Sequence, residues 1–237
     1  MTRRSATLLS FPCEAQSPRG VLATALKRHR LPELLSEDLL QLAAAWPGYE
    51  PAEALACALA SRMKLEAIDL ERARGILLLG PAGAGKSAIA AKIVRAAKLA
   101  GRTTDLTGAV EGLALFRSGT HPSDTLTVME ADGFNPLNPR ATAAFSALGG
   151  IAGVEAIGVV SALGDAEDVG EIVAALRLRR VIVTGLDRTR RLGGLVAAIT
   201  GGARLAHVTY GSRPDDALET LEPDALAQML LKDDASV

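Results

Sequence analysis

Hydrophobic residues in the first third of the chain recur at the spacing of one helix face. Residues 1–19 have no such period and are rich in Ser and Pro, so we expect an irregular segment there. Residues 20–70 contain three apolar stripes, separated by Pro32 and by Pro47-Gly48, which predict a small helical bundle. The stripes are Leu22, Ala25, Leu26 and His29; Leu35, Leu39, Leu42 and Trp46; and Leu55, Leu59 and Met63.

The pattern changes at about residue 72, where short apolar runs begin to alternate with helical segments. The expected strands are 76–79, 125–130, 156–161, 180–184 and 205–210, and the expected helices are 87–99, 167–178, 192–199, 223–231 and one from Pro139 to Gly149-Gly150. Such alternation is typical of α/β proteins with a mainly parallel sheet flanked by helices. We therefore expect an α/β domain over 72–232, preceded by the helical bundle, with ligands beyond the carboxyl ends of the strands.

One glycine-rich segment lies between the first expected strand and the helix after it. Residues 80–87 read Gly-Pro-Ala-Gly-Ala-Gly-Lys-Ser, a complete G-x-x-x-x-G-K-S phosphate loop. Its glycines let successive backbone N–H groups point at phosphate oxygens, and the following helix adds its positive end. The lysine reaches the β- and γ-phosphates, and the serine hydroxyl binds Mg²⁺. The segment predicts a P-loop NTPase, with Gly80, Gly83, Gly85, Lys86 and Ser87 as phosphate and metal contacts.

Composition narrows the classes of partner. Aromatic residues make up 3% of the chain and the formal net charge is −1, so neither stacking platforms nor a broad positive surface for nucleic acid is expected. Cys13 and Cys57 have no metal-ligand spacing and suit a reducing compartment. No apolar run reaches the roughly 18 residues of a membrane-spanning helix, and the run after Arg3-Arg4 is too short for a signal-peptide core. We expect a cytoplasmic protein, with any membrane contact peripheral.

An aspartate follows the expected strand at 180–184, on the edge where ligands bind. Thr184-Gly185-Leu186-Asp187 continues to Leu192-Gly193, and this stretch resembles the T-K-L-D-E-x-x-x-L-G segment of the signal-recognition-particle type GTPases. The resemblance implies that Asp187 accepts hydrogen bonds from N1–H and the amine of guanine, and adenine lacks this pair of donors. The alternative role of Asp187 is an ordinary helix N-cap.

The loop after the last expected strand supports the same resemblance. The family has T-x-G-Q-x-V-P-x-D in its base-contacting loop, which Thr209, Gly211, Pro214 and Asp216 fit with one residue fewer in the middle. The likeness is greatest to the flagellar, FlhF-like members. It implies bound GTP and Mg²⁺, and a homodimer or heterodimer formed through the G domain. The base contacts that it implies are Thr184, Asp187 and Gly211.

Two further segments depart from the family. In the family's D-T-x-R-x-x-A-x-x-Q-L segment, Thr103, Leu106 and Gly112 hold the Asp, Arg and Gln positions, and no apolar strand precedes them. The family's D-T-A-G-R becomes Glu130-Ala131-Asp132-Gly133-Phe134. Because a catalytic arginine is worth a factor of roughly 10³–10⁵, we expect GTP hydrolysis that is weak or depends on a partner.

Some of the family's contacts remain available in these segments. Glu130 is able to hold the Mg²⁺ shell through water, and Gly133 to offer its N–H to a γ-phosphate. Asp132-Gly133 is equally an ordinary turn. Gly185 replaces the lysine whose stem covers the guanine face, so we expect weaker affinity for the base.

These features favour a GTP-binding regulator of flagellar or membrane-targeted assembly. Two alternatives stay open: a general P-loop ATPase or NTPase, and a scaffold that has lost nucleotide binding. Base preference separates the first two, and any nucleotide binding excludes the scaffold. Basic clusters at 177–180 and 188–191 suit a solvated face, with an anionic partner or a lipid surface as the alternative.

Overall fold

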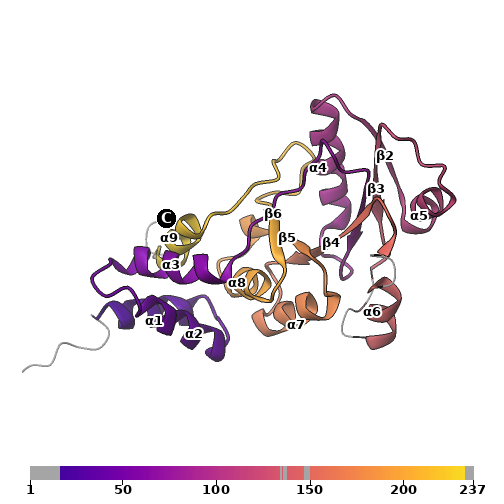
Figure 1. The fold of residues 1–237 in the computed structure, drawn as a ribbon. Coiled ribbons are helices and arrows are strands. Elements are labelled where there is room, and N and C mark those ends of the chain that lie inside the picture. Colours follow the sequence, from indigo (N-terminus) through magenta and orange to yellow (C-terminus); the bar gives the residue numbers. More distant parts are fainter. Residues whose placement is uncertain (1–16, 134, 136–137, 147–149, 233–237) are drawn as a thin grey trace, which may run out of the picture.

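The computed structural model describes residues 17–133, 135, 138–146 and 150–232, and in this part six strands form one parallel sheet (Figure 1). The strands are β1 (Gly75–Leu79), β2 (Thr103–Gly108), β3 (Thr125–Glu130), β4 (Val154–Ser161), β5 (Arg180–Thr184) and β6 (Arg204–Val208). Their order is β2-β3-β1-β4-β5-β6. Because β1 lies between β3 and β4, the loop after β1 is where the strand order changes direction, the usual place for a ligand.

Helices cover both faces of the sheet, because alternate side chains of each strand point to opposite faces. Ile76 and Leu78 of β1 pack with α4 (Lys86–Leu99), whereas Leu77 and Leu79 pack with α5 (Ala109–Ser118). Further helices are α6 (Pro139–Ser146), α7 (Ala166–Leu176) and α8 (Gly193–Thr200), of which α7 and α8 pack on β4 and β5. The predicted α/β architecture is confirmed.

Four helices form a bundle beside the sheet (Figure 1). They are α1 (Pro18–Arg28), α2 (Glu33–Ala43) and α3 (Pro51–Arg62) from the start of the described chain, and α9 (Pro223–Leu231) from its end. Their leucines share one buried core with the valines of β5 and the inner face of α8. The bundle and the α8 side of the sheet therefore share one continuous core.

Trp46 does not belong to the bundle core, contrary to the predicted stripe. The helix α2 ends at Ala43, and the turns that follow leave Trp46 44% exposed. Its ring lies against that of Tyr49, with 5.4 Å between the centroids. The helical period therefore stops one turn earlier than the sequence indicates.

The edge strand β2 and the helix α5 that follows it are elements that the sequence did not predict. No strand precedes Thr103 after α4 in the described chain, but residues 103–108 themselves pair with β3, from Thr103 opposite Thr125 to Gly108 opposite Glu130. An edge strand pairs through its backbone on one side only, so it needs no apolar run. The first part of the segment that departs from the family pattern is therefore a strand, and α5 follows it at once.

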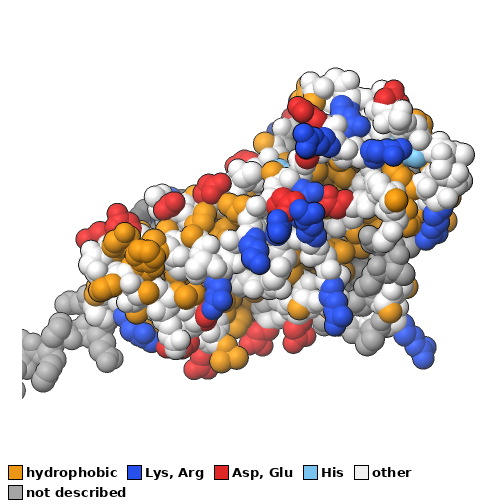
Figure 2. Space-filling model, viewed as in Figure 1, with side chains coloured by type: hydrophobic (Ala, Val, Ile, Leu, Met, Phe, Trp, Pro, Cys, Tyr) orange, Lys and Arg blue, Asp and Glu red, His pale blue; other side chains and the backbone are white. Residues whose placement is uncertain are grey.

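The outer surface carries both signs of charge. Figure 2 shows Lys and Arg side chains interspersed with Asp and Glu over the sheet, and hydrophobic side chains gathered over the helical bundle. In the described residues, no helix combines the length and the apolar character that crossing a bilayer requires.

Candidate nucleotide-binding site

The phosphate loop joins β1 to α4 and lies against β4. A Cβ on Gly80 would sit 2.1 Å from the carbonyl oxygen of Val159, so only glycine fits the close approach of these two backbones. Gly85 has φ +94° at the N-cap of α4, a conformation that glycine adopts without steric cost. Gly80 and Gly85 therefore fix the turn from β1 into α4, and the start of a helix is a place that favours anions.

The lysine of the loop is folded across it. Lys86 Nζ donates hydrogen bonds to the carbonyl oxygens of Gly80, at 3.1 Å, and Pro81, at 2.9 Å. Burial lowers the pKa of Lys86, while the carboxylates of Glu130 and Asp132 act in the opposite direction. Both of these acceptors are neutral. A phosphate oxygen is charged, so it would bind the ammonium more strongly and replace them.

Ser87 and Glu130 meet at the other side of the loop. Ser87 Oγ donates to Glu130 Oε2 at 2.7 Å, not far from the spacing of about 3.0 Å between adjacent ligands of an octahedron with bonds of about 2.1 Å. Both groups are oxygen ligands of the kind that Mg²⁺ prefers. No cluster of three or more His, Cys, Asp or Glu among the described residues suits a metal ion. Mg²⁺ here would therefore take its other ligands from phosphate and water.

The turn after β3 lies against the phosphate loop. A Cβ on Gly133 would be 2.7 Å from Ala82 Cα, so the two backbones are in close contact. This places Gly133 beside the loop, and its N–H contact to a γ-phosphate stays a prediction. Phe134, which follows it, lies outside the described residues.

A cavity of about 100 Å³ continues from the phosphate loop toward the last two strands. Residues predicted from three separate segments line it: Gly83, Gly85, Thr184, Asp187 and Gly211. Thr184 Oγ1 donates to the carbonyl of Ala84 at 2.8 Å, which ties the end of β5 to the phosphate loop. Asp187 lies exposed in the short 3-10 turn Leu186–Arg188, and the N-cap of α8 is Leu192. Asp187 is therefore not the cap of the helix that follows.

Leu163, in the loop after β4, was not foreseen as a site residue. It lines the same cavity, and its Cδ1 lies 3.7 Å from the position of a Cβ on Gly185. This leucine, which is 48% exposed, therefore occupies the space beside the glycine that replaces the family's lysine. Nothing in its local sequence distinguishes it from an ordinary loop leucine.

Lys92 of α4 is a second residue that the sequence reading missed. Its Nζ donates to the carbonyl oxygens of Arg213, at 2.7 Å, and Asp216, at 2.9 Å, and lies 3.7 Å from Asp216 Oδ2. The residue is 2% exposed, so the helix after the phosphate loop holds the loop after β6 from inside. A lysine next to Ile93 on the buried stripe of α4 is the signal that could have found it.

The three departures in the catalytic segment lie on β2 and α5. Leu106 is an exposed residue of the edge strand. Gly112 is buried on α5, and a Cβ there would be 2.4 Å from Met129 Cγ. A glutamine at this position would therefore require Met129 to move. Thr103 lies at the start of β2, whereas Glu130 pairs with Gly108 at the other end of that strand.

Solved structures of other proteins have a similar fold. A crystal structure of FlhF complexed with GTP/Mg²⁺ matches with a TM-score of 0.73 and 20% identity, over 91% of this chain and 99% of that one. The cell division protein FtsY from Thermotoga maritima matches with a TM-score of 0.72 and 16% identity, over 91% and 88%.

The signal recognition particle receptor FtsY from Elizabethkingia anophelis matches with a TM-score of 0.67 and 15% identity, over 89% of this chain and 85% of that one. No family model and no curated protein matches the sequence. At this level of identity the likeness is one of architecture. The chain therefore has the fold shared by FlhF and by the signal recognition particle receptor FtsY.

Proposed function

We propose that this protein binds GTP and Mg²⁺ as an FlhF-like member of the signal-recognition-particle type GTPases. The observation that carries the proposal is the cavity in which Asp187, Thr184 and Gly211 meet the phosphate-loop residues Gly83 and Gly85. FlhF structures are described as complexes with GTP/Mg²⁺ and with GMPPNP/Mg²⁺, on a fold that this chain shares.

Each group has a separate part in this binding. The N–H groups of the phosphate loop and Lys86 hold the phosphates, and Mg²⁺ beside Ser87 and Glu130 neutralises part of their charge. Asp187 accepts from the two guanine donors, and Leu163 covers one side of the base with apolar surface. Lys92 keeps the loop at 211–216 in place. The cavity, of about 100 Å³, is smaller than most ligand sites, so we expect the loop at 211–216 to move when the base binds.

Hydrolysis in this proposal is slow without a partner. Phosphoryl transfer depends on charges placed around the transition state. Leu106 brings no charge to the arginine position, and Gly112 brings no polar group to the glutamine position. A GTP-loaded state that persists until a partner completes the site would suit a regulator of flagellar or membrane-targeted assembly. In such a role the protein would work in the cytoplasm or at the inner face of the membrane, paired through its G domain.

The first experiment is a titration with fluorescent GTP and ATP analogues in Mg²⁺. We expect guanine-selective binding that Lys86→Ala weakens by about a hundredfold, the loss of two charge-assisted contacts. Asp187→Asn removes the acceptor that pairs with both guanine donors, so it should abolish the preference for GTP over ATP. A single-turnover assay then measures hydrolysis.

The outcomes separate the alternatives. Equal affinity for both bases that Asp187→Asn leaves unchanged would favour a general NTPase, and no binding of either would favour a scaffold. Rapid single-turnover hydrolysis by the isolated protein would contradict the partner-dependent mechanism but not GTP binding.

A further inference from the structure

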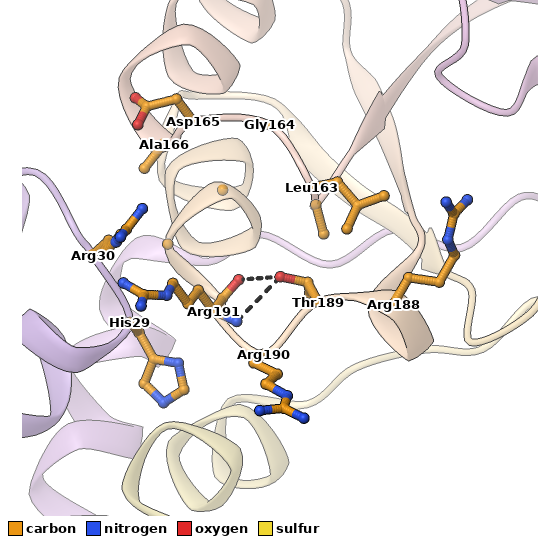
Figure 3. A pocket seen from close by; sticks show the side chains of 13 residues that line it. His29, Arg30, Leu163, Gly164, Asp165, Ala166, Arg188, Thr189, Arg190 and Arg191 are labelled. Carbon is orange, nitrogen blue, oxygen red and sulfur yellow. Dashed lines mark hydrogen bonds between the residues drawn. The ribbon is translucent and has the colours of Figure 1, made fainter. Parts of the chain in front are cut away.

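A second cavity, of about 350 Å³, lies where the helical bundle meets the loops after β4 and β5 (Figure 3). None of the phosphate-loop residues lines it. Four of the described arginines line it, together with a single carboxylate, that of Asp165. They are Arg30, Arg188, Arg190 and Arg191.

The positive charge of this cavity is not balanced within the described chain. None of the four arginines forms an ion pair with another described residue. The Asp165 carboxylate is engaged as the N-cap of α7, where Oδ1 accepts from the N–H of Glu167 at 2.9 Å. Figure 3 shows the guanidinium groups of Arg30 and Arg191 on the same side of the cavity, and Arg188 and Arg190 extending in other directions.

Arg30 has an unusual backbone position for an arginine. It follows α1 with φ +57°, its N–H donates to the Lys27 carbonyl at 3.0 Å, and the N–H of Leu31 donates to the Leu26 carbonyl at 3.2 Å. This is a Schellman helix end, in which the left-handed residue is usually glycine. An arginine at a strained backbone position beside a cavity is an outlier that points to a function.

Arg191 is also held in place. Thr189 Oγ1 donates to the Arg191 carbonyl at 2.8 Å and accepts from its N–H at 3.1 Å, so the turn before α8 is fixed (Figure 3). Gly193 brings this turn against the bundle, because a Cβ there would be 2.7 Å from the Arg30 carbonyl oxygen. The two arginines thus come from separate layers of the fold but face one space.

We propose that this cavity, the arginine pocket, is a binding site for a phosphate group, held chiefly by Arg30 and Arg191. Guanidinium groups match phosphate oxygens in pairs of charge-assisted hydrogen bonds, which accounts for the use of arginine rather than lysine. The start of α8, which has no acidic residue in its first turn, adds positive potential at the cavity. The phosphate belongs either to a soluble ester or to an anionic lipid headgroup. The pocket shares Leu163 and Arg188 with the base cavity, but Arg30 and Arg191 do not line that cavity, so the proposal does not rest on GTP binding.

Two probes test the proposal and separate the two sources. Inorganic phosphate is added to the full chain, and amide hydrogen exchange is measured at 188–194 and, separately, at 80–88, so that binding at the phosphate loop is recognised. Flotation with vesicles of phosphatidylglycerol and phosphatidylcholine, against phosphatidylcholine alone, tests the lipid source. The test variant is Arg30→Gln with Arg191→Gln, and the matched control is Arg95→Gln with Arg117→Gln, two exposed arginines outside the pocket.

A phosphate-dependent slowing of exchange at 188–194, weakened about tenfold or more in the test variant and kept in the control, establishes a soluble phosphate ligand. Flotation that depends on phosphatidylglycerol and is lost only in the test variant establishes a lipid headgroup. If the unchanged protein responds to neither probe, or if both double variants respond alike, the proposal is wrong. Melting temperatures of the variants show whether each is folded.

Discussion

At the scale of single residues, the left-handed backbone conformation of Arg30 lowers the stability of the fold but places this arginine at the pocket. An L-residue in the left-handed region costs about 1–2 kcal/mol, and glycine avoids this cost. Glycine also gives the unfolded chain more freedom, which cancels part of the gain in stability. We expect Arg30→Gly to raise the free energy of unfolding by about 0.5–1 kcal/mol, measured by urea denaturation. The same variant should lose the phosphate response of the arginine pocket.

The chain contains a matched control for this change. Arg177, at the end of α7, is the other described non-glycine residue with positive φ, at +49°, and it does not line the arginine pocket. Arg177→Gly should give a similar gain in stability and leave the phosphate response intact. Stabilisation by neither change would show that the strain at these helix ends is negligible.

At the scale of elements, α4 is the link between the phosphate loop and the base cavity. Its first residue is Lys86, and two turns later Lys92 holds the loop after β6 by two hydrogen bonds. Lys92→Met keeps the length and the apolar stem but leaves the carbonyls of Arg213 and Asp216 without their donor. We expect a loss of about 1–3 kcal/mol in the free energy of unfolding, measured in urea.

The same variant tests whether the loop matters for the base. Limited proteolysis within 211–216 should become faster, and the affinity for the GTP analogue should fall by about tenfold. Lys98→Met, an exposed residue of the same helix, is the control and should change neither. Unchanged proteolysis in Lys92→Met would mean that the loop after β6 is held by its own turn.

The sequence predicted those elements whose hydrophobic pattern is set by burial. β3 and β5 have the predicted bounds, because every residue but one in these strands is buried. β2 was missed because its Thr and Asp side chains are exposed or half-buried at the sheet edge, so the strand has no apolar run. Leu163 and Lys92 were missed for a different reason: each contributes to the site through contacts with loops distant in sequence.

At the scale of the whole molecule, His29 joins the bundle to the sheet. It is 5% exposed, Nε2 lies 3.0 Å from the Leu230 carbonyl of α9, and Nδ1 accepts from the N–H of Leu192 at 3.2 Å. Because Nδ1 is an acceptor, Nε2 must carry the hydrogen and donate to Leu230. One imidazole therefore connects α1, α9 and the start of α8. No functional role was predicted for it.

Substitutions of His29 test its two hydrogen bonds separately. His29→Ala leaves the Leu192 N–H buried without its acceptor, whereas the Leu230 carbonyl keeps the hydrogen bond from Arg28 Nη2 at 3.0 Å. We expect the free energy of unfolding to fall by about 1–3 kcal/mol. Asn has an acceptor near the position of Nδ1, and Gln has a donor near that of Nε2, so each should restore part of the loss.

Urea unfolding followed separately by circular dichroism and by Trp46 fluorescence measures both the loss and its location. If the bundle, which holds Trp46, unfolds before the sheet only in His29→Ala, His29 is what makes the two parts unfold together. Coincident transitions in all four proteins would instead assign that cooperativity to the shared apolar core.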